Sequence, residues 1–371
     1  MDKNDKRTIR VWFADSFDTY ARGLFQTILE QNYNVTYDEH HPQFLFYSVW
    51  GYEHLTYGED CIKVMYSGEN LFPNFNEFDY AISSTKLEYM GRHLYLPPCC
   101  YHDTKGEANL PLEDLNPGMA KRRFCCFMFR QSGHGDGSAL REDLCKALSA
   151  NYKRVDCPGH VLHNMDAPEL SQRYTNDWST SKIKFLTQYK FNIAYENSNS
   201  PGYVTEKLTD CFKANTVPIY WGSEGTDLPK DAMIYANDYP DMESLIKRIM
   251  EVDNNDEEYM RILAANPLRH GISYNRHSQL SEFICNIVEH GTKLPHALNS
   301  FFQGDGAFRL IYATQNGKRR GLTQLFLRLL QLVVCLKSIL PWGNKKDLKH
   351  DRMLIGGLLW REKVARLRID V

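Results

Sequence analysis

The sequence lacks the motifs of several common enzyme classes. It has no Gly-x-Gly-x-x-Gly and no Gly-x-x-x-x-Gly-Lys-Ser/Thr motif, which argues against a nicotinamide enzyme and a P-loop kinase. It also has no Cys-x-x-Cys pair, no Cys/His run at zinc spacing and no Asp-x-Asp pair. Because clustered carboxylates are absent, cationic side chains rather than a divalent metal are expected to hold any diphosphate that the protein binds.

Long apolar runs are absent too. Segment 322–336 is apolar but is interrupted by Gln324, Arg328 and Gln331, so it falls short of the roughly 20 residues that cross a bilayer. The polar N-terminus leads into a short apolar run, residues 8–13, which is too short for the core of a signal peptide. We therefore expect a cytoplasmic protein whose ten cysteines are reduced thiols.

The composition is that of a folded protein of about two domains. The chain has 371 residues, of which 43% are hydrophobic and 24% charged, and this excludes a disordered chain. A formal net charge of −2 argues against a basic nucleic-acid binder. The charge is uneven, because residues 317–371 contain 13 Lys/Arg and 4 Asp/Glu, a balance of +9. With apolar patches at 322–336 and 353–360, this tail predicts a basic amphipathic segment that lies on an anionic membrane or packs on the catalytic part.

Short apolar runs alternate with helical patterns, which indicates an α/β architecture with two halves around a cleft. A polar stretch with Pro and Gly, residues 105–119, is expected to be a linker or an inserted loop between the halves. The first half has predicted strands at 8–13, 43–50, 61–66 and 78–83 and a predicted helix at 19–31. The second half has predicted strands at 123–129, 191–195 and 217–221, and predicted helices at 138–150, 204–214, 241–252, 257–265 and 277–290.

The segment around residues 191–208 carries the most chemical information. A predicted buried strand ends in polar residues, a Pro/Gly turn follows, and a helix opens with Thr205, Glu206 and Lys207 in its first turn. Ligands of open α/β sheets bind at such strand ends. Free N–H groups, the helix dipole and the charge of Lys207 favour a phosphate, and Glu206 can accept from sugar hydroxyls. The pattern suits a nucleotide sugar, and ordinary helix capping is the alternative interpretation.

Several short motifs in and around this segment resemble the donor-binding signature of the α1,3/4-fucosyltransferases of glycosyltransferase family 10, most closely the bacterial branch. The motifs are YKFN at 189–192, YENS at 195–198, GYVTEK at 202–207 and VPIYWG at 217–222. A second group is similar to the family's acceptor-side segment, with YSGEN at 66–70, PNFN at 73–76 and FDYAI at 78–82. The two groups occur in the right order, one in each predicted half.

The resemblance implies two Rossmann-like domains that face a cleft, the GT-B arrangement. Residues 1–118 would form the acceptor-binding domain, 119–302 the GDP-fucose-binding domain and 303–371 the basic tail. The implied reaction is inverting and moves fucose from GDP-fucose to the 3- or 4-hydroxyl of N-acetylglucosamine, or to the 3-hydroxyl of glucose. The implied acceptors are lactosamine, lacto-N-biose or lactose units of Lewis-type surface glycans such as lipopolysaccharide.

Glu69 matches the acidic residue to which the family assigns the role of general base. It follows the predicted strand 61–66, so its carboxylate is expected to project from a strand end into the cleft. Some relatives carry a second carboxylate two positions later, where this chain has Leu71. A surface or capping glutamate is the alternative interpretation of Glu69.

The remaining site residues are expected to bind the donor. Arg141 matches the family's phosphate-binding arginine, and we expect Arg141 and Lys207 to stabilise the negative charge on the departing GDP. By the same resemblance, Glu206 binds the ribose hydroxyls, and Asn197 and Tyr203 line the nucleotide pocket. For Glu196 two roles are open, since it either orients fucose or bonds to the backbone. A helix arginine in solvent is the alternative for Arg141.

The expected partners are GDP-fucose, an oligosaccharide acceptor and, through the tail, the inner face of a membrane, with no essential metal or other cofactor. Two other functions are considered. One is a related inverting transferase that uses another nucleotide sugar, and the other is a membrane-attached glycan-binding module without catalysis. The presence of Glu69, Arg141, Glu206 and Lys207 together favours an enzyme.

Overall fold

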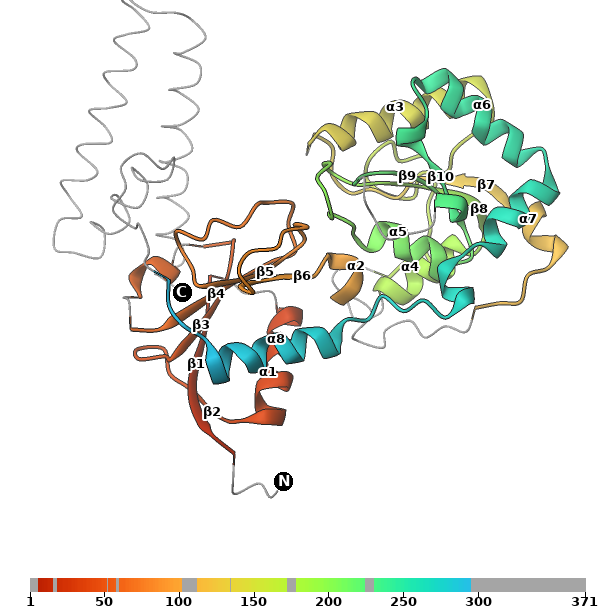
Figure 1. Ribbon diagram of the computed structural model, residues 1–371. Coiled ribbons are helices and arrows are strands. Elements are labelled where there is room, and N and C mark those ends of the chain that lie inside the picture. The colour runs from red at the N-terminus through yellow and green to blue at the C-terminus, as the bar shows by residue number, and fades with distance from the viewer. Residues whose placement is uncertain are drawn as a thin grey trace, which may run out of the picture.

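Two lobes, each built on a parallel sheet, make up the part of the chain that the computed structural model describes (Figure 1). The described residues are 6–15, 19–51, 53–57, 60–101, 112–133, 135–171, 178–223 and 230–294. The predicted tail, 303–371, lies outside them. Within these ranges, no helix has the length and apolar character needed to span a membrane.

The first sheet has six parallel strands in the order β2-β1-β3-β4-β5-β6. Its strands are β1 (Thr8–Ala14), β2 (Asn34–Tyr37), β3 (Phe44–Ser48), β4 (Ile62–Ser67), β5 (Tyr80–Ser83) and β6 (His93–Tyr95). The four predicted strands are confirmed, and α1 (Thr19–Asn32) confirms the predicted helix. The patterns missed β2 and β6, because neither strand contains a fully buried residue and so neither forms an apolar run.

The second sheet has four parallel strands in the order β10-β9-β8-β7. They are β7 (Arg123–Cys126), β8 (Tyr189–Tyr195), β9 (Val217–Trp221) and β10 (Ile234–Tyr235). The core on one face contains residues of α3 (Asp136–Asn151), α6 (Met242–Asp253) and α7 (Asp256–Ala264). On the other face lie α4 (Trp178–Leu186) and α5 (Glu206–Lys213), as Figure 1 shows. The predicted pair of Rossmann-like α/β domains is confirmed, although α4 and the two-residue β10 were not predicted.

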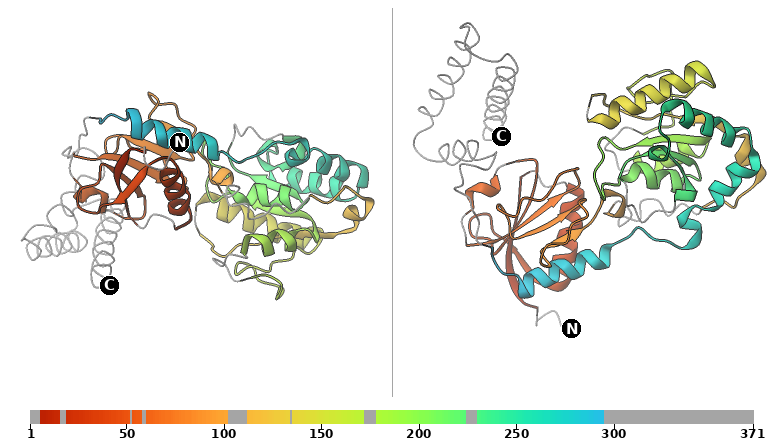
Figure 2. Two further views of the ribbon diagram at one scale, coloured as in Figure 1. Left: turned by 90° about the horizontal axis from the view of Figure 1, so that it is seen from below. Right: turned by 45° about the horizontal axis from the view of Figure 1, so that its top comes forward.

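One boundary of the predicted domains is corrected by α8 (His277–His290), which was assigned to the second domain. This helix returns to the first domain and lies beside α1 in both views of Figure 2. Its buried residues Ile284 and Ile287 share a core with Ile9 of β1. Arg7 also donates from Nη1 to the carbonyl of Val288 at 2.9 Å. The apolar stripe of α8 was visible in the sequence, but the sheet that it covers was not.

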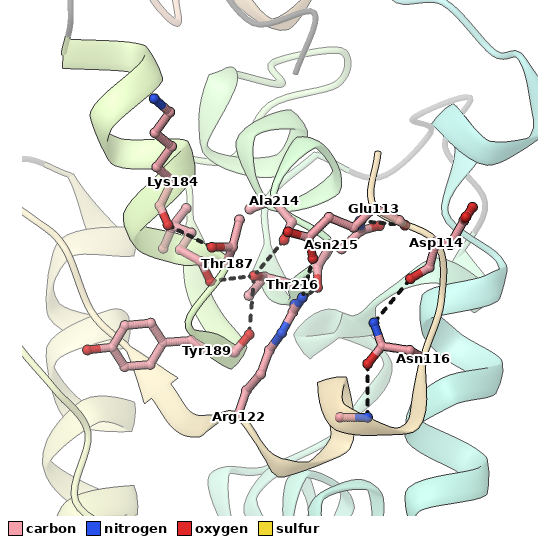
Figure 3. Close-up of polar contacts among 12 residues, drawn as sticks. Glu113, Asp114, Asn116, Arg122, Lys184, Thr187, Tyr189, Ala214, Asn215 and Thr216 are labelled. Atoms are coloured by element: carbon pink, nitrogen blue, oxygen red, sulfur yellow. Dashed lines mark hydrogen bonds and ion pairs between the residues drawn. The ribbon is translucent and has the colours of Figure 1, made fainter. Parts of the chain in front are cut away.

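The other boundary is corrected by the chain that enters the second domain. Residues 112–118 were assigned to the first domain and to a linker, yet they are fixed to the second. Asn215 Nδ2 and Arg269 Nη2 both donate to the carbonyl of Glu113, at 3.4 and 2.7 Å. Arg122 Nη1 in turn donates to the carbonyl of Asn215 at 2.7 Å, as Figure 3 shows. The second domain therefore begins before residue 119.

The two domains share one apolar core. Cys99 and Cys100 of α2 (Pro98–Tyr101) belong to the same cluster as Leu208 and Cys211 of α5. The backbone of Cys99 also donates to the carbonyl of Val204 at 3.1 Å. This contact joins the segment after β6 to the start of α5.

Candidate functional site

The candidate site lies at the carboxyl ends of β7 and β8. Cys126 of β7 pairs with Asp156 on one side, and β7 pairs with β8 on the other, so chain connections leave β7 in opposite directions. In open α/β sheets a crevice forms at such a point, and ligands bind in it. Arg141 of α3 spans the two strand ends. Its Nη2 donates to the carbonyl of Gln131, after β7, at 2.8 Å, and its Nη1 donates to Asn197 Oδ1, after β8, at 2.9 Å.

Glycines allow α3 to approach the end of β8. The backbone N–H of Gly137 donates to the carbonyl of Asn197 at 3.1 Å. A Cβ on Gly137 would lie 2.0 Å from the carbonyl oxygen of Glu196, which is inside van der Waals contact. Gly135 has a φ of +74°, and a Cβ there would lie 2.3 Å from the carbonyl oxygen of Asn197. Residues 135–137 are glycine-rich because backbone packs directly on backbone at this point.

Arg141 is buried rather than placed at the surface of the crevice. Only 2% of the residue is exposed, and its guanidinium carbon lies 3.8 Å from the centroid of the Phe129 ring. Burial lowers the pKa of Arg141 to about 10. Its Nε has no hydrogen-bond partner among the described residues. The interpretation of Arg141 as a helix arginine in solvent is therefore wrong, because its guanidinium contacts Phe129, Gln131 and Asn197.

Glu196 bonds to the backbone, the second of the two roles left open for it. It is fully buried, and its carboxylate accepts from the N–H of Thr205 at 2.7 Å and from Thr205 Oγ1 at 2.8 Å. Lys207 Nζ lies 3.3 Å from the same carboxylate. Burial raises the pKa of Glu196, and Lys207 and the Thr205 bonds oppose this. Through these contacts Glu196 holds the start of α5.

The start of α5 presents the other predicted donor-binding residues. Thr205 is the N-cap, and its Oγ1 accepts from the N–H of Lys207 at 3.3 Å, so the helix begins at Glu206 and not at residue 204 as predicted. The side chain of Lys207 is 17% exposed, and Glu206 is half-buried. Tyr203 is only 4% exposed. The helix dipole and the ammonium of Lys207 give this end of α5 a positive character.

Glu69 reaches the same region from the first domain. It lies on the loop after β4, where Ser84 Oγ donates to its carbonyl at 3.1 Å. The residue is exposed to solvent, and yet desolvation by surrounding protein raises the pKa of its carboxyl. Lys207 lowers this pKa and Glu206 raises it, so the carboxylate of Glu69 interacts electrostatically with the start of α5 in the other domain.

Polar contacts between the two loops were not predicted from the sequence. Asn70 Nδ2 donates to Ser198 Oγ at 2.6 Å, and Ser200 Oγ donates to Asn70 Oδ1. All three lie inside the matched motifs or between them, but nothing in their spacing indicated that they meet. Among the described residues, no group of three or more His, Cys, Asp or Glu side chains is arranged to hold a metal ion.

Two family models match the chain, one for each domain. Residues 11–101 match the model described as "Alpha-(1,3)-fucosyltransferase FucT N-terminal domain". Residues 120–294 match "Glycosyltransferase family 10 (fucosyltransferase) C-term". Together the two models cover more than half of the chain, including Glu69 and every residue of the candidate site.

Similar proteins were found among both sequences and solved structures. The chain is 29% identical to an alpha-(1,3)-fucosyltransferase FucT of Helicobacter pylori over 286 residues, which are 69% of this chain and 59% of that protein. It is 26% identical to a putative fucosyltransferase of Acanthamoeba polyphaga mimivirus, over 71% of this chain and 43% of that protein. The chain thus spans less than two thirds of the length of these relatives.

A crystal structure of an alpha1,3-fucosyltransferase matches with a TM-score of 0.63 and 24% identity, over 79% of this chain and 93% of that chain. A structure described as alpha1,3-fucosyltransferase with GDP-fucose matches with a TM-score of 0.61 over 79% of this chain and 94% of that chain. These likenesses show a shared two-domain fold and confirm the predicted GT-B architecture.

The burial of Arg141 leads to a prediction for Asn197. Asn197→Ala removes the acceptor of Arg141 Nη1 and leaves a buried charged donor unsatisfied, so we expect the free energy of unfolding to fall by roughly 1–3 kcal/mol. Asn199→Ala is the matched control, since Asn199 is exposed on the same loop. Urea unfolding of the two variants measures the difference. Equal stability of Asn197→Ala and Asn199→Ala would contradict the role given to this hydrogen bond.

Proposed function

The chain belongs to glycosyltransferase family 10, and from this premise we propose that it is an inverting fucosyltransferase that uses GDP-fucose. The proposed acceptors are the 3- or 4-hydroxyl of N-acetylglucosamine, or the 3-hydroxyl of glucose, in lactosamine, lacto-N-biose or lactose units. One observation carries the proposal. Asn70, next to Glu69 in the first domain, is hydrogen-bonded to Ser198 and Ser200 of the loop that leads to α5 in the second, and Lys207 lowers the pKa of Glu69.

This arrangement supports a displacement with Glu69 as the general base. In such a step the acceptor hydroxyl attacks the anomeric carbon of fucose, its proton passes to Glu69, and the bond between that carbon and the phosphate oxygen breaks. Inversion requires that base and leaving group lie on opposite faces of the sugar. A base on one domain and a phosphate site on the other meet this requirement. A raised pKa also makes Glu69 a stronger base than an ordinary glutamate.

The departing GDP needs positive charge, and three features support the proposal that this chain supplies it. Lys207 provides an ammonium that is partly exposed, and it lies at the N-terminal end of α5, where the helix dipole favours an anion. Arg141 adds a buried charge beneath the strand ends, and it keeps Asn197 in place. We propose that these groups make a divalent metal unnecessary, that Glu206 binds the ribose, and that Asn197 and Tyr203 line the nucleotide pocket.

A donor and acceptor panel tests this function. GDP release is measured with GDP-fucose, GDP-mannose and UDP-sugars against lactose, N-acetyllactosamine and lacto-N-biose, each with and without a chelator. We expect release only with GDP-fucose, unchanged by the chelator, and an α-linked fucose on the 3- or 4-hydroxyl by linkage analysis. Preference for another donor would identify a related transferase instead. Glycan binding without release from any donor would identify a non-catalytic module.

Glu69→Gln removes the proposed base and keeps its size. We expect turnover to fall by about 10²-fold or more while the affinity for GDP stays the same, because the donor site lies on the other domain. Since the base must be deprotonated and burial raises its pKa, the acid limb of kcat/KM in the unmodified protein should lie above the ordinary glutamate value of 4.5. Glu88→Gln, at an exposed position of the same domain, is the control. Near-normal turnover of Glu69→Gln would refute the assignment.

The location of the protein is a further part of the proposal. The tail 303–371 carries an excess of Lys and Arg with apolar patches, which supports peripheral binding to the inner face of an anionic membrane. Sedimentation with vesicles of anionic and of neutral lipid measures this membrane binding. We expect the protein to sediment with the anionic vesicles alone, and failure to do so would contradict this part of the proposal.

A further inference from the structure

The side chain of Asn70 connects the two loops of the candidate site. Its amide nitrogen donates to Ser198 Oγ at 2.6 Å, and its amide oxygen accepts from Ser200 Oγ. Both serines belong to the second domain and lie on the loop after β8, so the two ends of one amide hold two points of that loop. The contact joins residues 128 and 130 positions apart in the sequence.

Asn70 is itself held firmly by the first domain. The carbonyl of Glu69 accepts from Ser84 Oγ at 3.1 Å, and the carbonyl of Leu71 accepts from Thr85 Oγ1 at 2.9 Å. Both donors follow β5, so the backbone on either side of Asn70 is fastened to the sheet. The amide therefore extends from a fixed backbone, and the proposed base is its immediate neighbour.

The loop on the other side connects the two parts of the donor site. It begins after Asn197, the partner of Arg141, and ends at Thr205, the N-cap of α5. Two further bonds hold its middle to the first domain. Lys86 N–H donates to the carbonyl of Pro201 at 3.2 Å, and Tyr95 OH donates to that of Gly202 at 2.8 Å.

Gly202 shows how closely the two domains approach there. Its φ is +93°, and a Cβ at this position would lie 2.8 Å from the carbonyl oxygen of Ser84. Only glycine fits a left-handed conformation in so narrow a gap. Ser84 is also the residue that holds Glu69, so the donor loop packs directly on the support of the proposed base.

Resting on the proposed function, we propose that Asn70 is a positioning residue that sets the distance between Glu69 and the donor loop. A carboxamide offers one donor and one acceptor at a fixed separation, and here each is used by one serine of the facing loop. Ordering two loops against each other matters for a group transfer, because a displacement of about 1 Å between base and donor can cost of the order of 10²-fold in rate.

The first test is Asn70→Ala, which removes both hydrogen bonds. We expect kcat for fucosyl transfer to fall by about 10- to 100-fold, while the affinity for GDP-fucose measured by calorimetry changes by less than about threefold. Asn74→Ala is the matched control, because the side chain of Asn74 bonds to Glu77 and Asn76 inside the first domain. Equal kcat values for the two variants would overturn the proposal, and so would a loss explained by donor affinity alone.

A mutant cycle separates this role from a general loss of structure. Ser198→Ala with Ser200→Ala removes the same two bonds from the opposite side, so adding Asn70→Ala to this pair should lower kcat no further. If the fall in kcat of the triple variant equals the product of the falls caused by the serine pair and by Asn70→Ala, the proposal is overturned. Asn70→Asp keeps an acceptor for both serine hydroxyls but adds a negative charge beside Glu69. The acid limb of the pH–rate profile of Asn70→Asp should move to higher pH. Above that limb, the kcat of Asn70→Asp should exceed the kcat of Asn70→Ala.

Failure of the proposed function gives a different result from failure of this inference. If the unmodified protein releases GDP from no donor, the proposed function is wrong, and the connection is then tested by hydrogen exchange. Asn70→Ala should speed exchange of the amides at 198–203 and leave those of α3 unchanged. Unchanged exchange at 198–203 would overturn the inference in that case as well.

Discussion

The end of β8 is the point on which the rest of the site depends. Two successive residues directly after this strand each bind a cation from a different helix layer. Glu196 binds Lys207 of α5, and Asn197 binds Arg141 of α3. A buried cation without a partner is strongly destabilising, so these contacts fix both helices to one strand end. The positive character of the crevice is therefore part of how the second domain is held together.

Local patterns in the sequence were sufficient to predict most strands of the two sheets. Apolar runs located β1, β3, β4 and β5, and the polar residues after β8 with the Pro/Gly turn located the start of α5. Short strands with partly exposed residues, such as β2 and β6, lack this signal. The sheet on which each helix packs could not be predicted, because an apolar stripe such as that of α8 fits either sheet equally well. Which sheet it covers depends on the path of the whole chain.

The residues of the candidate site could likewise be predicted from the sequence only in part. The resemblance to family 10 led to Glu69 and Lys207, and the structure brings them into electrostatic range. It also led to Arg141, but a motif cannot show whether a guanidinium faces a crevice or lies under it. Burial of Arg141 follows from the glycines that let α3 approach β8, and the sequence did not predict this close approach. In the same way, the motif indicates Glu196 as a site residue, whereas in the structure its carboxylate holds the start of α5.

The relation between the two domains is determined by two different kinds of contact. The segments α2 and α5 share an apolar core, which is tolerant of small displacements because dispersion and burial have little directionality. The loops beside this core contact each other through hydrogen bonds with defined donors and acceptors, and these lose strength steeply when geometry changes. The apolar core therefore holds the domains together, and the hydrogen bonds determine their register. A reaction whose base and donor site lie on different domains requires both kinds of contact, because the apolar core alone would not place Glu69 correctly against the start of α5.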